Sequence, residues 1–281
     1  MASAPSDLDA DILVIGSGAA GLSAALVARE LGADVLVIEK SDRFGGTTAV
    51  SGGVCWIPNN DRMAEWGEDD SPEKAMTYLR RLSLGRLDEA LARRYVEEAP
   101  DVIRYIEAHS ALRFQAINSL DYHEEFEGGM IRRSLCPELY PAGDLGELRP
   151  HLRASGHFPV PVAPTDVEDG VDLMDPDLMG DRLQKDLVGL GAALVAGLLK
   201  AAADRGVRFQ RDTPARRLVR ENGRIVAADA EHDGREIRIG ARRAVILAAG
   251  ASNGTKTWAG NSCAARSRYR ARRHGTPATG C

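Results

Sequence analysis

Cysteine is scarce in this chain, and its spacing excludes two common uses of the residue. Four cysteines stand among 281 residues, without the short spacings that a metal-binding or redox pair requires. The six histidines are scattered as well, so we predict no metal site. Unpaired thiols suit a reducing cytosol, and we therefore expect a cytoplasmic protein.

Long apolar runs are also missing. The longest, Leu187 to Leu199, contains three glycines and stops at Lys200, so it is too short to span a bilayer. The first ten residues hold two acids and no basic residue, which is unlike a signal peptide. The net charge of −5 argues against a nucleic-acid surface. We therefore expect no transmembrane segment and no nucleic-acid partner.

Glycine, in contrast, is abundant, and one cluster of it is highly informative. The run Gly16-Ser17-Gly18-Ala19-Ala20-Gly21 follows an apolar stretch, residues 11–15, and opens an alanine-rich one. Gly16 allows a sharp strand-to-helix turn, Gly18 lets the backbone approach a pyrophosphate, and Gly21 permits close packing of helix on sheet. The helix N-terminus adds free N–H groups and the positive end of its dipole. The run predicts a dinucleotide-binding βαβ unit.

An acid stands where such a unit needs one. A second apolar run, residues 35–38, ends on Glu39, eighteen residues after Gly21. A carboxylate at this point hydrogen-bonds the ribose hydroxyls of a dinucleotide, and its charge disfavours a 2′-phosphate.

Two more glycine pairs follow, Gly45-Gly46 and Gly52-Gly53, with hydroxyl residues between them. A unit that binds only NAD has no need of them. A longer cofactor that lies extended along the protein does, because backbone must pass close to its second phosphate, ribityl chain and flat ring. The sequence therefore favours FAD over NAD.

Residues 40–60 resemble the FAD-binding family of fumarate reductase and succinate dehydrogenase flavoproteins. The part from Ser51 to Asn60 resembles the family's 3-ketosteroid dehydrogenase branch, and the likeness extends from about residue 10 to residue 250. It implies an FAD-dependent oxidoreductase that takes a hydride from a steroid ring to the flavin and a proton to a base. Its partner would be a small-molecule substrate, a steroid.

Two alternatives remain open. One is a fumarate reductase-like enzyme acting on a small dicarboxylate, although its arginine and histidine ligands would fall after residue 250 and the run Trp56-Ile57-Pro58 argues mildly against it. The other is a non-catalytic FAD-binding fragment, which is what we expect of this chain as it stands.

The glycine pattern and the resemblance together predict the cofactor contacts. In the family, the residue matching Ala215 meets the adenine through its backbone, and the pair matching Ala249-Gly250 lies against the cofactor. The full set is Gly16, Ser17, Gly18, Ala20, Gly21, Glu39, Lys40, Arg43, Gly45, Gly46, Thr47, Thr48, Ser51, Gly52, Gly53, Ala215, Ala249 and Gly250.

The resemblance also nominates a catalytic residue. Residues 119–124 resemble the family's active-site loop, whose tyrosine takes part in proton transfer, and Tyr122 stands at that place. The second aromatic usual in that loop is replaced here by His123. A packing role for Tyr122 is the alternative.

We predict an α/β fold, a Rossmann-like FAD-binding domain with a helical and loop-rich insertion, here truncated. Residues 1–60 form its first βαβ unit, 61–185 an insertion near the flavin, and 186–250 a return to the FAD-binding domain. Patterning predicts helices over 72–84, 88–98, 100–109 and 186–203, and strands over 207–209, 216–220, 225–228, 236–239 and 244–250. Residues 111–180 are expected to form long loops.

The remaining segment, residues 251–281, has a different composition. It holds six Lys or Arg and no Asp, Glu, Leu, Ile, Val, Phe or Met, so it lacks the apolar surface that offsets ordering entropy, and we expect disorder. A basic arm for nucleic acid or membrane is one interpretation. We favour a frameshift, because the codons after Ala251, read one base out of frame, permit a stretch beginning Phe-Glu-Trp-Asn-Glu-Asp-Met that resembles the family.

Resequencing of the gene is expected to find one G missing from a Gly-Gly codon pair at Ala251. An intact frame to Cys281, with no flavoprotein-like sequence in the adjacent frame, would contradict this prediction.

Overall fold

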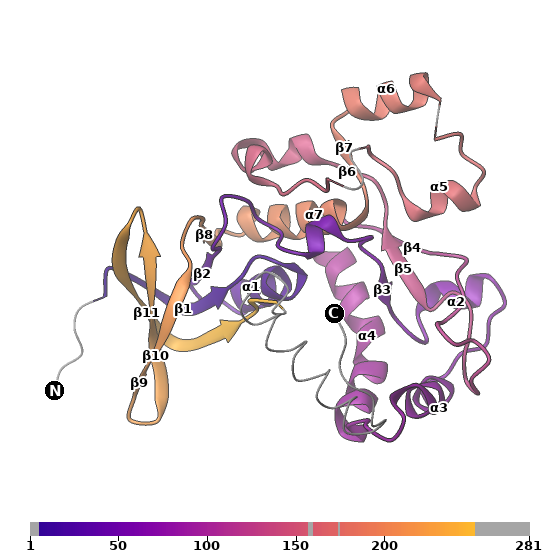
Figure 1. The fold of residues 1–281 in the computed structure, drawn as a ribbon, viewed down its shortest axis with the longest axis horizontal. Coiled ribbons are helices and arrows are strands. Elements are labelled where there is room, and N and C mark those ends of the chain that lie inside the picture. The colour runs from indigo at the N-terminus through magenta and orange to yellow at the C-terminus, as the bar shows by residue number, and fades with distance from the viewer. Residues whose placement is uncertain (1–5, 157–159, 174, 251–281) are drawn as a thin grey trace, which may run out of the picture. The chain divides into compact units, whose positions relative to one another are not determined.

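A six-stranded sheet carries the N-terminal glycine turn. The computed structural model describes residues 6–156, 160–173 and 175–250, and the account below is of the unit Met1–Ala248. The sheet has the order β8-β2-β1-β11-β10-β9 (Figure 1). Its strands are β1 (Leu8–Ile15), β2 (Val35–Ile38), β8 (Arg208–Gln210), β9 (Ala215–Glu221), β10 (Arg224–His232) and β11 (Arg235–Leu247). The first four strands in this order run parallel, whereas β11, β10 and β9 form an antiparallel meander.

Both faces of the parallel part are covered, as the unbroken apolar run of β2 predicts. On one face, Val14 and Val37 pack with Ala25 of α1 (Ala19–Glu30) and Ala202 of α7 (Leu190–Asp204). On the other, Leu13 and Leu36 of neighbouring strands cluster with Ala228 and Ile239 of the meander. The helices α1 and α7 lie side by side (Figure 1).

The strand β11 corrects the prediction of two strands over 236–239 and 244–250. It runs unbroken from Arg235 to Leu247, and Gly240 within it pairs with Ala227 of β10 and with Asp9 of β1. Two neighbouring strands, one on each side, supply hydrogen bonds through the residues between the two predicted strands.

The two predicted helices over 88–98 and 100–109 are one helix, α4 (Glu89–His109), with Pro100 inside it. Asp88 caps it, since its side chain accepts from Leu91 N at 3.0 Å. A proline in a helix removes one hydrogen bond, but the buried side chains of Val96, Ile103 and Ile106 hold this helix in place. The neighbouring α3 (Pro72–Ser83) begins after Ser71 as predicted, and the cap bond from Lys74 N to Ser71 Oγ is 3.2 Å.

The helix predicted over 186–203 begins four residues late. Residues 187–188 instead form β7 (Leu187–Val188), which pairs with β6 (Tyr140–Pro141). The Arg149 guanidinium donates to both Asp186 oxygens at 2.6 and 2.7 Å and holds Asp186 outside the helix. The helix ends as predicted, with Gly206 at φ +80° after its C-cap.

Residues 111–180 hold more structure than predicted. β4 (Phe114–Ala116) and β5 (Ser134–Pro137) form a sheet with β3 (Cys55–Trp56). The short helices here and before are η1 (Thr48–Val50), α2 (Asp61–Glu65), η2 (Ala142–His151), α5 (Pro164–Glu168) and α6 (Pro176–Gln184). Contacts between residues far apart in the sequence stabilise these short strands and helices. The local pattern of apolar residues therefore does not predict them. Within the described residues, every helix is too short or too polar to cross a bilayer.

Candidate cofactor site

The first glycine run forms the turn that its sequence predicts. Gly16 has φ +108°, a conformation that side chains avoid. A Cβ on Gly21 would lie 2.0 Å from Gly16 O, so α1 packs directly on the turn. The first bond inside α1 runs from Leu22 N to Gly18 O at 3.0 Å. The N–H groups of Ala20 and Gly21 precede it and belong to those that a helix leaves without an intrahelical partner.

Ser17 joins three parts of the site. It is fully buried, its Oγ donates to Glu39 Oε2 at 2.6 Å, and it accepts from Gly45 N at 3.0 Å. The other carboxylate oxygen, Glu39 Oε1, accepts from Ser41 N at 3.1 Å. A carboxylate has about four acceptor positions, so Glu39 keeps capacity for a ribose hydroxyl. The sequence predicts both Ser17 and Glu39 as cofactor contacts, but not the hydrogen bond by which the serine orients the carboxylate.

The second glycine pair lies against the start of α1. Thr48 Oγ1 accepts from Ala19 N at 3.1 Å, across 29 residues of sequence. Gly45 has φ +115°, and a Cβ there would lie 2.7 Å from the Cβ of Ala49. Gly46 follows with φ +51°. The structure thus brings the two glycine runs together at one helix N-terminus.

The third glycine pair meets the start of α7. Gly53 has φ +69°, and a Cβ there would lie 2.5 Å from Leu190 C. Gly191 N donates to Ser51 O at 3.0 Å, and a Cβ on Gly191 would lie 1.8 Å from Thr48 O. Gly191 was missed by the sequence reasoning, where it stands as an ordinary residue inside a predicted helix.

Ala215 lies at the start of β9, two residues after Thr213, which is hydrogen-bonded to Glu39. Thr213 N donates to Glu39 O at 2.8 Å. Ala215 therefore enters the sheet beside the ribose end of the predicted site.

The remaining predicted contacts are more peripheral. Lys40, Thr47 and Gly52 are exposed, and the Arg43 guanidinium donates to Pro150 O at 2.7 Å. Ala249 and Gly250, also exposed, follow Ala248 at the end of the sheet. Their cofactor contacts stay predictions.

Arg153 is a basic residue that the sequence reasoning missed. Its guanidinium donates to Ser41 Oγ at 2.6 Å, while its buried Nε has no hydrogen-bond partner within the described residues. It lines a cavity of about 150 Å³ together with Ala49, Asp186 and Leu190. Arg153 therefore places a cation beside Ser41, two residues after Glu39.

Tyr122 lies elsewhere, on a loop that a bridge between Leu120 and Ile131 closes. Its side chain is 89% exposed, and its backbone oxygen accepts from the Tyr78 hydroxyl. The structure leaves its catalytic role a prediction.

The residues around the glycine turns fit an extended dinucleotide. They offer a helix N-terminus free of side chains at Gly18, an oriented carboxylate at Glu39, and a second glycine turn at Gly45-Gly46. A helix N-terminus and a carboxylate of this kind suit a pyrophosphate and a ribose, and a second glycine turn suits a longer cofactor, but the individual contacts stay predictions.

Comparison with known proteins agrees with this geometry. The family model of the FAD binding domain matches residues 11–278, and the chain belongs to this family. FAD is its cofactor, and its relatives are dehydrogenases. The predicted family, fold class and cofactor are confirmed.

Two curated relatives show where in the family it falls. The 3-oxosteroid 1-dehydrogenase of Mycobacterium tuberculosis H37Rv is 33% identical over 264 residues, which cover 85% of this chain and 47% of the relative. The 4-oxocyclohexanecarboxylate 2-dehydrogenase of Sinomonas cyclohexanicum is 32% identical over 252 residues, covering 85% and 43%. The chain therefore spans about half the length of the curated relatives it matches.

Solved structures give the same picture. The 3-ketosteroid Δ1-dehydrogenase from Sterolibacterium denitrificans, in complex with 1,4-androstadiene-3,17-dione, matches with TM-score 0.77 and 34% identity, covering 86% of this chain and 48% of that one. A flavocytochrome c3 fumarate reductase matches with TM-score 0.59 and 19% identity over 86% and 34%, a likeness of fold alone.

The frameshift hypothesis concerns residues that lie outside the described part of the chain. The family match includes most of that segment, and the hypothesis stays a prediction.

Replacing Ser17 by alanine is expected to weaken FAD binding about tenfold and to lower the free energy of unfolding. The change leaves the Glu39 carboxylate and the Gly45 N–H without their shared partner, and an unsatisfied buried polar group costs about 1–3 kcal/mol. Flavin fluorescence titration and urea unfolding measure the two effects. Ser83→Ala, at an exposed hydroxyl bonded to Arg80 O, is the control, and equal affinity in both variants would contradict the prediction.

Proposed function

We propose that the enzyme dehydrogenates a ring ketone, and specifically a 3-ketosteroid, with FAD as the hydride acceptor. The observation that carries the proposal is the 34% identity and TM-score of 0.77 with a 3-ketosteroid dehydrogenase over 86% of the chain. The corresponding values for the fumarate reductase, 19% and 0.59, show a likeness of fold alone.

The reaction breaks two C–H bonds on neighbouring carbons and forms a C=C bond between them. One hydrogen leaves as a proton to a base, and the other leaves with its electron pair as a hydride. FAD, when bound, accepts that hydride. Loss of the proton next to the ketone builds negative charge on the ketone oxygen, which requires a hydrogen-bond donor aimed at it.

The role proposed for this chain's own residues is twofold. The two glycine turns and Glu39 hold the cofactor, and Tyr122 takes part in moving the proton. A tyrosine works as a base only when its pKa lies near the working pH, which requires a positive charge or hydrogen-bond donors beside the phenol oxygen. Tyr122 is 89% exposed, so its hydroxyl is accessible to a substrate.

A smaller ring ketone is the second candidate substrate. The relative from Sinomonas cyclohexanicum is named for 4-oxocyclohexanecarboxylate, and its identity of 32% is close to that of the steroid enzyme. The two substrates share a ketone in a six-membered ring, so the chemistry of the step is the same for both.

Anaerobic bleaching of the flavin tests the proposal and separates the candidates. A version with the predicted frame restored after residue 250 is loaded with FAD and mixed with a 3-ketosteroid, with 4-oxocyclohexanecarboxylate or with succinate. We expect the steroid to bleach the flavin absorbance and succinate to leave it unchanged. Bleaching by 4-oxocyclohexanecarboxylate alone would assign the smaller substrate, and bleaching by succinate alone would contradict both ring-ketone proposals.

A further inference from the structure

Arg133 is a buried cation in the insertion, far in sequence from the glycine turns of the candidate cofactor site. Its side chain is 0% exposed. The guanidinium donates to Asp70 Oδ2 and Oδ1 at 2.9 and 2.6 Å, to Asp121 Oδ2 at 2.7 Å and to Gly128 O at 2.8 Å. Four of its five N–H donors are thereby accounted for. The group also lies 5.6 and 5.8 Å from the ring centres of Trp56 and Tyr78.

The second partner, Asp121, immediately precedes Tyr122 and serves three donors. Its Oδ1 accepts from Trp56 Nε1 at 2.6 Å, and its Oδ2 accepts from Met130 N at 3.1 Å as well as from Arg133. The backbone bond from Asp121 N to Met130 O, at 2.9 Å, ties the two sides of the loop together. We call residues 119–132 the Tyr122 loop.

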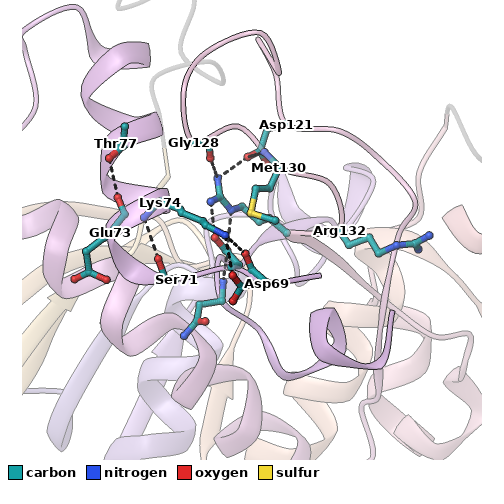
Figure 2. A network of polar contacts seen from close by, with 12 residues as sticks. Asp69, Ser71, Glu73, Lys74, Thr77, Asp121, Gly128, Met130 and Arg132 are labelled. Carbon is teal, nitrogen blue, oxygen red and sulfur yellow. Dashed lines mark hydrogen bonds and ion pairs between the residues drawn. The ribbon is translucent and has the colours of Figure 1, made fainter. Parts of the chain in front are cut away.

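The loop is also pressed against α3. Figure 2 shows Gly128, Asp121 and Met130 grouped beside the N-terminus of α3, where Ser71 is the N-cap and Lys74 lies in the first turn. Gly128 has φ +85°, and a Cβ there would lie 2.3 Å from Lys74 O. From the same helix, the Tyr78 hydroxyl donates to Tyr122 O. Burial raises the pKa of Tyr78, and so does the nearby Asp121 carboxylate, so that this phenol stays a donor.

The result is a loop whose backbone is fixed on both sides of one exposed side chain. Asp121 is bound through Arg133, and the backbone oxygen of Tyr122 is bound through Tyr78, while the Tyr122 ring extends into solvent. Buried charges are expensive to desolvate, and losing one partner of such a group leaves the other charge buried and uncompensated. An apolar anchor would hold the loop at less cost but would not set its backbone direction so closely.

We propose that Arg133, through Asp70 and Asp121, is a positioning residue that sets the place of Tyr122 for proton transfer. The positioning role rests on the role proposed above for Tyr122, whereas the anchoring of the loop rests only on the contacts of Arg133 and Asp121. A misplacement of about 1 Å at a reacting group can cost about 10²-fold in rate. The bonds of Arg133 can therefore affect the rate by positioning Tyr122, without Arg133 contacting the substrate.

The test compares Arg133→Gln with Arg182→Gln. Arg182 forms an equally fork-like pair with Asp166 at 2.7 and 2.8 Å, about 10% exposed, outside the Tyr122 loop. Arg133→Lys keeps the charge and is the conservative variant, and it replaces Arg133→Gln if that variant fails to fold. Amide exchange of residues 119–132 in the 281-residue chain and steady-state kinetics of the FAD-loaded, frame-restored enzyme are both measured.

We expect Arg133→Gln to raise amide exchange in the Tyr122 loop at least about tenfold and to lower kcat about 10²-fold, with KM and FAD affinity little changed. Arg133→Lys should recover part of the kcat, and Arg182→Gln should leave both the loop and kcat unchanged. Unchanged exchange in the Tyr122 loop of Arg133→Gln would overturn the anchoring.

Failure of the proposed function gives a different result. If Tyr122→Phe lowers kcat while Arg133→Gln does not, the positioning role is overturned and the role of Tyr122 stands. If neither variant lowers kcat, the role of Tyr122 is overturned and the positioning proposal with it, while the exchange result alone decides whether Arg133 anchors the loop.

Discussion

Replacing Gly18 by valine is expected to abolish FAD retention while leaving the rest of the fold in place. A Cβ at this position would lie 3.3 Å from Thr48 Oγ1 and 3.9 Å from Gly45 O, so the turn can accept it with a shift of a few tenths of an ångström. The added methyl groups would instead occupy the space through which the pyrophosphate approaches the start of α1. Loss of two hydrogen bonds to a charged group, at about 1.5–3 kcal/mol each, weakens binding about 10²–10⁴-fold.

The absorbance of bound flavin in the purified protein measures this effect, and circular dichroism checks the fold. Gly180→Val is the matched control, because Gly180 lies on α6 with no atom within 4 Å of an added Cβ. Gly21→Val is the opposite case, since its Cβ would lie 2.0 Å from Gly16 O and should disrupt the turn itself. Normal flavin content in Gly18→Val, or a colourless parent that binds NAD tightly, would contradict the prediction.

Replacing Tyr122 by phenylalanine is expected to lower turnover about 10²–10⁴-fold, the usual worth of a general acid or base. The side chain is 89% exposed and its backbone oxygen keeps the bond from Tyr78, so loss of the hydroxyl should not change stability or FAD affinity. A chemical role therefore predicts a loss of kcat without a loss of fold.

Turnover with a 3-ketosteroid in the frame-restored, FAD-loaded enzyme is the measurement. Tyr105→Phe serves as the control, since Tyr105 stacks on His109 within α4, away from the Tyr122 loop. Equal kcat in the two variants, with normal flavin content, would leave Tyr122 with a packing role only.

The βαβ unit could be predicted because its signals are local. Alternation of apolar residues, a glycine turn and an acid at the right distance suffice for β1, α1, β2 and Glu39, and the observed β2 has the predicted bounds. The contacts that complete the site join residues far apart in the sequence, such as Ser17 with Gly45 and Thr48 with Ala19. The local pattern of apolar and polar residues does not predict these contacts.

Arg132 and Arg133 show the limit most clearly. They are adjacent and chemically identical, yet Arg133 is fully buried between two aspartates while Arg132 stacks on the exposed Trp66, 4.0 Å from its ring centre. Which of the two turns inward depends on the backbone direction at β5 and on where Asp70 arrives from the start of α3, 63 residues earlier. Sequence alone could not rank them.

The pairing of β1 with β11 also sets the order in which the protein can be built. One neighbour of β1 is β2, which follows it closely in the sequence. The other neighbour is β11, near the far end of the described chain, where Ile239 pairs with Leu8. On a ribosome that adds about 5–20 residues per second, β1 waits roughly 10–50 s for that partner, with a row of unpaired N–H and C=O groups along one side. Such an edge recruits strands from other chains. A chaperone that shields nascent β1 should therefore raise the yield of folded protein more than a substitution that slows unfolding of the finished protein.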